Sequence, residues 1–172
     1  QFERELARIV AKIPMNPGAY WLSGEEVKTI PQAEIQVNSN KKRSILQVIT
    51  PIPIVAGKAT AEINGKQSAT RVDSPTPDLF LRLSALEQFF LVKLDVKKDV
   101  RIVQTWDIVP VSKEVFETQT EVPVLKQELM EGLYKIWPEK PLEPGEYALV
   151  QFSPGQRNMQ AWDFRVTEGR GK

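Results

Sequence analysis

Carboxylates are the side chains that could carry acid-base chemistry here, because the 172 residues contain no histidine and no cysteine. Those two absences exclude a Ser-His-Asp triad, an imidazole base, a thiolate nucleophile and a cysteine zinc site. A glycosidase would need only two acids that face each other across a cleft. The acids near aromatic residues or predicted loops are Glu25, Glu26, Asp107, Glu117, Glu121 and Asp163. Nothing in their spacing indicates that two of them converge, so a carboxylate hydrolase is the third of our hypotheses.

Two kinds of short stretch resemble parts of known ligand sites without their full spacing. Residues 57–60 (Gly-Lys-Ala-Thr) and 65–68 (Gly-Lys-Gln-Ser) resemble the end of a phosphate-binding loop, but the earlier glycine and the following helix are missing. Asp95 and Asp99 flank one turn, whereas a calcium loop needs several closely spaced oxygen ligands. We therefore predict no catalytic residue, no cofactor and no metal site, and we expect the protein not to be an enzyme.

Aromatic side chains are the residues most able to form a binding surface, since exposed rings stack on sugars and anchor protein partners. Trp106 and Trp162 are in phase with apolar neighbours and are predicted to lie in the core. Trp21 lies beside a turn and Trp137 precedes a proline, so both are predicted near strand ends. We take Tyr20, Trp21 and Trp137 as the candidate ligand or partner surface.

The N-terminal segment is predicted to be a short amphipathic helix. Its apolar residues recur at helical spacing: Phe2, Leu6, Ile9, Val10 and Ile13. Pro14 and Pro17 should end it, because proline removes a backbone donor and disfavours helical geometry in the residue before it. We divide the chain into an N-terminal helical segment (1–17), a β domain (18–168) and a tail (169–172).

The rest of the chain consists of short extended runs separated by turn residues. Ser-Gly between 19–22 and 25–30, and Asn-Gly between 59–63 and 67–72, each predict a two-residue hairpin. Further along, alternation predicts a long central hairpin over 90–108.

The last third of the chain contains one ambiguous region and one clear hairpin. Residues 122–137 combine helical leucine spacing with a glycine, and we expect a helical turn or loop followed by a strand over 133–137. A final hairpin is predicted to pair 144–150 with 161–166.

These strands favour one fold class. They recur about every ten residues, there are 13 prolines, and long helices do not alternate with them. We predict two packed sheets, in an all-β, antiparallel immunoglobulin-like β-sandwich with a short N-terminal helix. Pro144, Gly145 and Tyr147 are predicted to form a structural corner, in which the tyrosine hydroxyl bonds the backbone a few residues upstream.

Residues 142–147 (Leu-Glu-Pro-Gly-Glu-Tyr) resemble the start of a late strand in immunoglobulin-like and transthyretin-like sandwiches. More broadly, residues 65–68, 77–81 and 144–149 resemble turn and core motifs of a group of uncharacterised bacterial proteins, many of them exported. The resemblance covers roughly half the chain, and only Phe80 stands where those proteins have an aromatic pair. It implies the sandwich fold and export, and it implies no activity.

Composition limits the partners and the location. A hydrophobic fraction of 41% and a charged fraction of 26% are ordinary for a globular domain. The net charge of +1 supplies no strong electrostatic field to steer nucleic acid or an anionic membrane toward the surface, so we predict no nucleic-acid partner. No apolar run reaches the roughly 18 to 20 residues of a membrane span. The chain begins at Gln1 without an initiator methionine, as a mature or a truncated chain does. Together with the resemblance to exported proteins, this leads us to expect a periplasmic or extracellular location.

Our leading hypothesis is a non-catalytic binding or structural module of a bacterial envelope or secreted protein. Its sandwich loops or an edge strand would contact another envelope protein. The alternative is a carbohydrate-binding sandwich that uses its exposed aromatic residues on a glycan. The sequence leaves the oligomeric state open.

Overall fold

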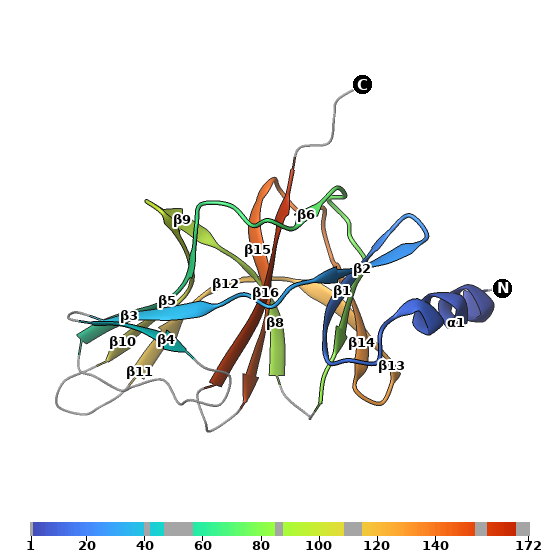
Figure 1. Cartoon of the computed structure of the whole chain (residues 1–172), viewed down its shortest axis with the longest axis horizontal. Coiled ribbons are helices and arrows are strands. Elements are labelled where there is room, and N and C mark those ends of the chain that lie inside the picture. Colours follow the sequence, from blue (N-terminus) through green and yellow to red (C-terminus); the bar gives the residue numbers. More distant parts are fainter. Residues whose placement is uncertain are drawn as a thin grey trace.

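The computed structural model describes residues 2–39, 42–46, 57–84, 88–108, 115–153 and 158–167. These residues form one short helix and three sheets that are stacked as layers (Figure 1). The predicted antiparallel, immunoglobulin-like sandwich with an N-terminal helix is confirmed as an all-β sandwich. It has three sheets where we expected two.

Sheet A forms one outer layer, in which neighbouring strands are antiparallel. Its strands, in spatial order, are β13 (Val124–Met130), β14 (Leu133–Pro138), β7 (Leu79–Arg82), β1 (Gly18–Ser23) and β2 (Glu26–Ile30). The predicted β1–β2 hairpin is confirmed, with Ser23 opposite Glu26. Its turn is therefore Gly24-Glu25, one residue later than expected.

Sheet B is the middle layer. Its strands, in spatial order, are β12 (Thr120–Val122), β8 (Gln88–Lys93), β15 (Gly145–Ser153), β16 (Asn158–Val166) and β6 (Arg71–Val72). The predicted final hairpin is confirmed as β15–β16, with Gly145 opposite Val166 and Val150 opposite Ala161. The short β6 runs parallel to β16, whereas the other neighbours in this sheet are antiparallel.

Sheet C forms the other outer layer. Its strands, in spatial order, are β11 (Val115–Thr118), β10 (Val100–Ile108), β5 (Gly57–Asn64), β3 (Ile35–Ser39) and β4 (Lys42–Leu46), and β9 (Asp95–Lys97) also pairs with β10. The β10–β5 pairing contains an irregularity between Ile102 and Gln104.

The core consists of two apolar layers, one on each face of sheet B. Tyr147 and Leu149 of β15 pack with residues of sheet A, whereas Ala148 and Val150 pack with residues of sheet C. Because both faces of sheet B are covered, β15 has a continuous apolar run instead of an apolar-polar alternation. Trp162 lies in the first layer and Trp106 in the second, so their predicted place in the core is confirmed.

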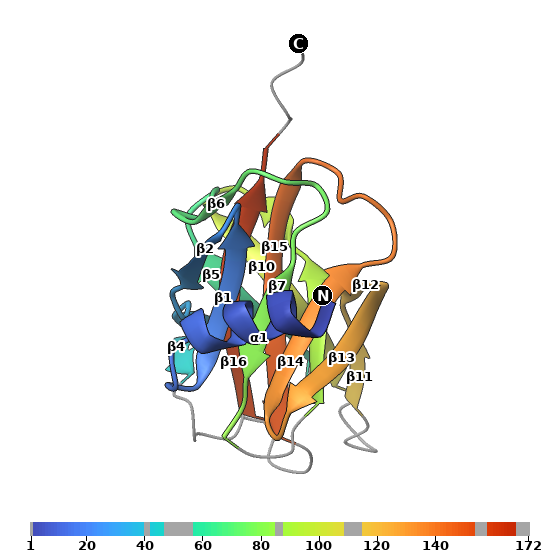
Figure 2. The same ribbon diagram turned by 90° about the vertical axis from the view of Figure 1, so that its right-hand side faces the viewer.

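Helix α1 (Phe2–Lys12) crosses the outer face of sheet A (Figure 2). Ile9, Val10 and Ile13 pack there against Tyr20 and Phe80. The helix ends before Pro14, as predicted. None of the helical structure in the described part of the chain has the length and apolarity that crossing a membrane requires.

The predicted hairpin around Asn64-Gly65 is wrong. Strand β5 ends at Asn64 but pairs with β3 and β10, whereas Arg71–Val72 joins sheet B beside β16. The reason is tertiary, because Arg101 of β10 donates hydrogen bonds to the carbonyls of Asn64 (3.1 Å) and Gly65 (3.0 Å). The Gly65 N–H also bonds the Asp99 carbonyl at 2.7 Å. The turn residues therefore hold a neighbouring strand and do not close a local hairpin.

The predicted long hairpin over 90–108 is wrong in its first half. Only β9 pairs with β10, from Val100 opposite Lys97 to Ile102 opposite Asp95, while β8 pairs with β12 and β15. The chain crosses from sheet B to sheet C at Leu94, whose N–H donates to the Glu146 carbonyl at 2.8 Å. Alternation continues through such a crossing, so the pattern could not indicate it.

The region 122–137 contains the predicted strand but no helical turn. Residues 133–137 lie in β14, and Val124–Met130 is a second strand that pairs with it. The turn requires glycine, because Gly132 has a φ of +79° and a Cβ there would lie 2.9 Å from the Leu83 carbonyl oxygen. A bulge lies between Glu128 and Met130.

Residues 115–130 follow one side of the molecule through all three layers. Strands β11, β12 and β13 are edge strands of sheets C, B and A, respectively. Figure 2 shows the three strands together on the right-hand side. Of the three, β13 is the longest.

Candidate functional site

Two acids meet at Arg101 between sheets B and C. Arg101 Nη1 lies 2.6 Å from Asp163 Oδ2 and 3.3 Å from Glu146 Oε1. The side chains of Arg101, Glu146 and Asp163 are only 3%, 8% and 14% exposed. Ser68 adds a hydrogen bond from its N–H to Glu146 Oε1 (2.6 Å) and one from its hydroxyl to the Asp163 carbonyl (3.1 Å). The carboxylates therefore act as buried, hydrogen-bonded counterions.

The titration of Glu146 follows from this burial. Burial raises the pKa of Glu146 above its ordinary value of 4.5, and the Ser68 N–H and the charge of Arg101 oppose that rise. A raised carboxyl pKa can mark a catalytic acid, but only where the group faces a cleft. The residues that line the two hollows described below do not include Glu146 or Asp163.

Asp163 was among the acids that we expected as candidates, whereas its partner Glu146 was not. The burial of Glu146 could have been inferred from its position in the sequence. It lies two and four residues before the apolar residues Ala148 and Val150, so all three side chains are on the same face of the strand. The 65–68 stretch that resembles a phosphate loop supplies Ser68 to this cluster. Among the residues that the structure describes, no three acids gather as a metal site would require.

The three candidate aromatic residues do not form one surface. Tyr20 and Trp21 are 3% and 4% exposed, and they point to opposite faces of sheet A. Tyr20 packs under helix α1, whereas Trp21 lies in the core between sheets A and B. Trp137 is half-buried and is the member of the three that reaches the surface.

Tyr20 belongs instead to a structural corner of the predicted kind. Tyr147 Oη donates to the Glu143 carbonyl at 2.6 Å, and Tyr20 Oη donates to the Asn16 carbonyl, also at 2.6 Å. Both tyrosines follow Pro-Gly-x, at residues 17–20 and 144–147. The second copy of this motif was the sequence signal that we missed. Burial raises the pKa of both hydroxyls.

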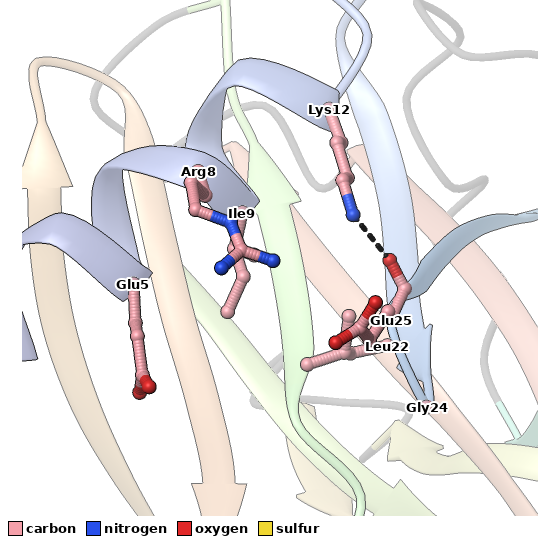
Figure 3. A pocket seen from close by; sticks show the side chains of 7 residues that line it. All are labelled: Glu5, Arg8, Ile9, Lys12, Leu22, Gly24 and Glu25. Atoms are coloured by element: carbon pink, nitrogen blue, oxygen red, sulfur yellow. Dashed lines mark hydrogen bonds between the residues drawn. The ribbon is translucent and has the colours of Figure 1, made fainter.

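Helix α1 and the β1–β2 turn enclose a hollow of about 220 Å³. It is lined by Glu5, Arg8, Ile9, Lys12, Leu22, Gly24 and Glu25 (Figure 3). Lys12 Nζ donates a hydrogen bond to the Glu25 carbonyl at 2.7 Å, and this bond links helix α1 to the β1–β2 turn at the edge of the hollow. Its two acids and two bases balance, and no charge is left to select a ligand.

A larger hollow of about 410 Å³ lies below the Tyr147 corner, between β12 and residues 139–143. Val122, Pro123 and Leu142 give it apolar walls. Lys93 Nζ lies 3.0 Å from Glu143 Oε2, but the Glu143 side chain is 80% exposed, so this ion pair contributes little to stability.

The strongest candidate for a binding surface is the β13 edge, which we define as residues 124–130. Its backbone pairs with β14 on one side, and no described strand pairs with its other side. Leu125 and Met130 are 46% and 48% exposed. Leu125 lies directly opposite Trp137, on the outer face of sheet A. Lys135 extends over the Trp137 ring, with its Nζ 5.1 Å from the ring centroid.

Strand β13 presents its charges on the face directed toward sheet B. Lys126 Nζ donates to the Phe89 carbonyl at 3.2 Å and lies 4.4 Å from the centroid of the Phe89 ring. Glu128 is on the same face of the strand, two residues further on. The β13 edge therefore combines a backbone that is unpaired on one side, an outer face with Leu125 and Leu129 on either side of Gln127, and one charge of each sign on its inner face.

Comparison of the chain with protein-family models, with curated proteins and with solved structures found no match.

Proposed function

We propose that this chain is a non-catalytic protein-binding module whose β13 edge takes up an extended segment of a partner protein. The observation that carries the proposal is the state of β13, a seven-residue strand that is bonded to the sheet along one side only. An edge of this kind offers a row of backbone donors and acceptors with which an added strand can pair.

The β13 edge differs from the neighbouring β12 edge on the same side of the molecule. Strand β12 has only three residues and is followed by Pro123, both of which protect an edge from pairing. Strand β13 is longer and exposes the apolar side chains of Leu125 and Met130. An added strand would cover them, and burial of apolar area favours association.

Trp137 gives the proposed surface an aromatic anchor. Its ring lies beside Leu125 on the outer face of sheet A, where a side chain of an added strand could contact it. The glycan alternative required a row of exposed rings, and the burial of Tyr20 and Trp21 leaves it with Trp137 alone. We therefore favour a protein partner.

We also propose that the module belongs to a bacterial envelope or secreted protein. This part of the proposal is supported by the resemblance of residues 65–68, 77–81 and 144–149 to exported bacterial proteins. Expression of the full-length gene product, followed by fractionation and N-terminal sequencing, tests it. Recovery of an uncleaved protein from the cytoplasm would contradict export.

A selection with displayed random peptides tests the binding function. Peptides enriched on the immobilised protein are measured by fluorescence anisotropy against wild type, Leu125→Asp and Val96→Asp. We expect Leu125→Asp to weaken binding about tenfold or more, since it places a charge where apolar contact is expected. Val96 is a matched control, because it is 44% exposed and lies on β9 of sheet C. Failure to enrich any peptide, or equal affinity for wild type and Leu125→Asp, would contradict the proposal.

A further inference from the structure

The β13 edge has a sequence that complements itself in an antiparallel arrangement. We propose that its partner is a second copy of this chain, paired β13 to β13 across a two-fold axis at Gln127. This inference rests on the proposed function, because it names the partner of the same edge. Such pairing would join the two copies of sheet A into one continuous sheet.

The charges select this register. An axis at Gln127 places Lys126 of each copy opposite Glu128 of the other, so two attractive pairs form. An axis at Lys126 would place two lysines opposite each other, and an axis at Glu128 would oppose two glutamates. Lys126 bonds the Phe89 carbonyl, and an ammonium has three N–H donors, so it can still bond a carboxylate.

The apolar residues fit the same register. Leu125 of each copy would lie opposite Leu129 of the other, on the outer face. Leu129 is half-buried against the apolar cluster that lies under helix α1. Pairing would therefore add the exposed Leu125 of the second copy to this cluster. It would not require any buried apolar side chain to become exposed.

The bulge limits the length of the pairing. It lies between Glu128 and Met130 and shifts the register of β13 against β14. A bulge bends its strand and increases the local twist. Leu129 is the bulge residue, so regular pairing should run from Lys126 to Glu128, with Leu125 and Leu129 in contact at its two ends. An interface this small lies below the roughly 1,200 Å² of stable complexes, so a weak, concentration-dependent dimer is expected.

Introduced cysteines test the register directly, because the chain has no cysteine of its own. Directly opposed residues in antiparallel strands have Cα atoms about 4.5–5.5 Å apart, which a disulfide can span. Gln127→Cys should therefore form a covalent dimer under a mild oxidant. Leu125→Cys is the control, since its two copies would be offset by four residues, about 13 Å along the strands. Equal rates for the two variants would overturn the register.

Charge reversal tests the energetics by sedimentation velocity over a range of concentrations. Glu128→Lys should raise the dissociation constant of the dimer about tenfold, because each of the two attractive pairs would become a repulsive pair of lysines. The double variant Lys126→Glu and Glu128→Lys should restore dimerisation, because it exchanges the two charges. Circular dichroism of each variant verifies that it is folded. No loss in the single variant, or no recovery in a folded double variant, would overturn the pairing.

The outcomes separate this inference from the function on which it rests. If the wild type remains monomeric at every concentration while selected peptides still depend on Leu125, the second copy is the wrong partner and the binding function stands. If the protein neither self-associates nor binds peptides at Leu125, both are wrong.

Discussion

Two strands of this molecule begin with the same sequence motif and the same tyrosine hydrogen bond, but they pack in different surroundings. Residues 17–20 lead into β1 and residues 144–147 lead into β15, and both have the sequence Pro-Gly-x-Tyr. In both, the tyrosine hydroxyl donates to the carbonyl four residues back at 2.6 Å. A Cβ on the glycine would lie near the tyrosine in each case, 3.6 Å from Tyr20 Oη and 3.9 Å from Tyr147 Cε2.

The third residue of the motif shows the difference. Ala19 is fully buried in the apolar layer between sheets A and B. Glu146 is buried between sheets B and C, where Arg101 and Ser68 hold it. The motif therefore determines the corner, whereas the layers on either side determine what the strand must carry. A corner of this kind shows how a strand begins and says nothing about a ligand.

Removal of the arginine beside the second corner should have the largest effect on stability. Arg101→Leu leaves Glu146 and Asp163 buried without their cation, and we expect a loss of about 3–5 kcal/mol in the free energy of unfolding. Arg82, near the first corner, donates its Nε–H to the Pro14 carbonyl at 2.9 Å and contacts no carboxylate as an ion pair among the described residues. Arg82→Leu should therefore cost less in urea denaturation. Equal costs would show that the ion cluster adds nothing beyond ordinary hydrogen bonding.

The same comparison has a pH dependence. Arg101 lowers the pKa of Glu146, so its removal raises that pKa further above 4.5. A carboxyl whose pKa is higher in the folded state binds more protons there, and stability then increases as pH falls through the folded pKa toward 4.5. The deficit of Arg101→Leu relative to wild type should shrink over that interval.

Replacement of each corner glycine by alanine should have the next largest effect on stability, and the effect should differ between the two corners. Gly18 has a φ of +154°, a conformation that side chains rarely adopt, so Gly18→Ala should cost about 1–3 kcal/mol. Gly145 does not have a positive φ, and a Cβ there meets its nearest neighbour, Lys93 Cε, at an ordinary 3.7 Å. Gly145→Ala should therefore be tolerated. Thermal unfolding of the two variants measures the two losses of stability. A larger loss for Gly145→Ala than for Gly18→Ala would contradict the conclusion that glycine is required at residue 18 and not at residue 145.

Loss of the corner hydroxyl should have the smallest effect, and the same effect at both places. Tyr20→Phe and Tyr147→Phe each remove one hydrogen bond and keep the ring, so each should cost about 0.5–1.5 kcal/mol. Urea denaturation of both variants measures the two losses. A loss at one tyrosine only would show that the shared geometry hides unequal roles.

The sequence predicted elements whose signals are local. The β15–β16 hairpin, the β1–β2 hairpin and the helix before Pro14 all follow from alternation, periodicity and turn residues within a short stretch. Two of the three wrong elements depend on distant residues. Arg101 redirects the Asn64-Gly65 turn, and Leu94 carries the chain from one sheet to another.

The third wrong prediction, the helical turn before β14, arose from the spacing of two leucines. Leu125 and Leu129 are four residues apart, a spacing that fits a helical stripe and one face of a strand equally well. Of the candidate surface, Trp137 was named and lies beside the β13 edge. The unpaired backbone of β13 could not be foreseen, since an edge is defined by which strands are absent beside it.

The segment 115–130 lies at an edge of each sheet in turn, and this has a consequence for folding. Its strands pair with β10, β8 and β14, whose edges stay open until the segment docks. Before the segment docks, all three sheets have an unpaired edge on this side of the molecule. Open edges of partly folded chains are the places where misassembly and aggregation begin, so the order in which this segment docks would govern the yield of native protein.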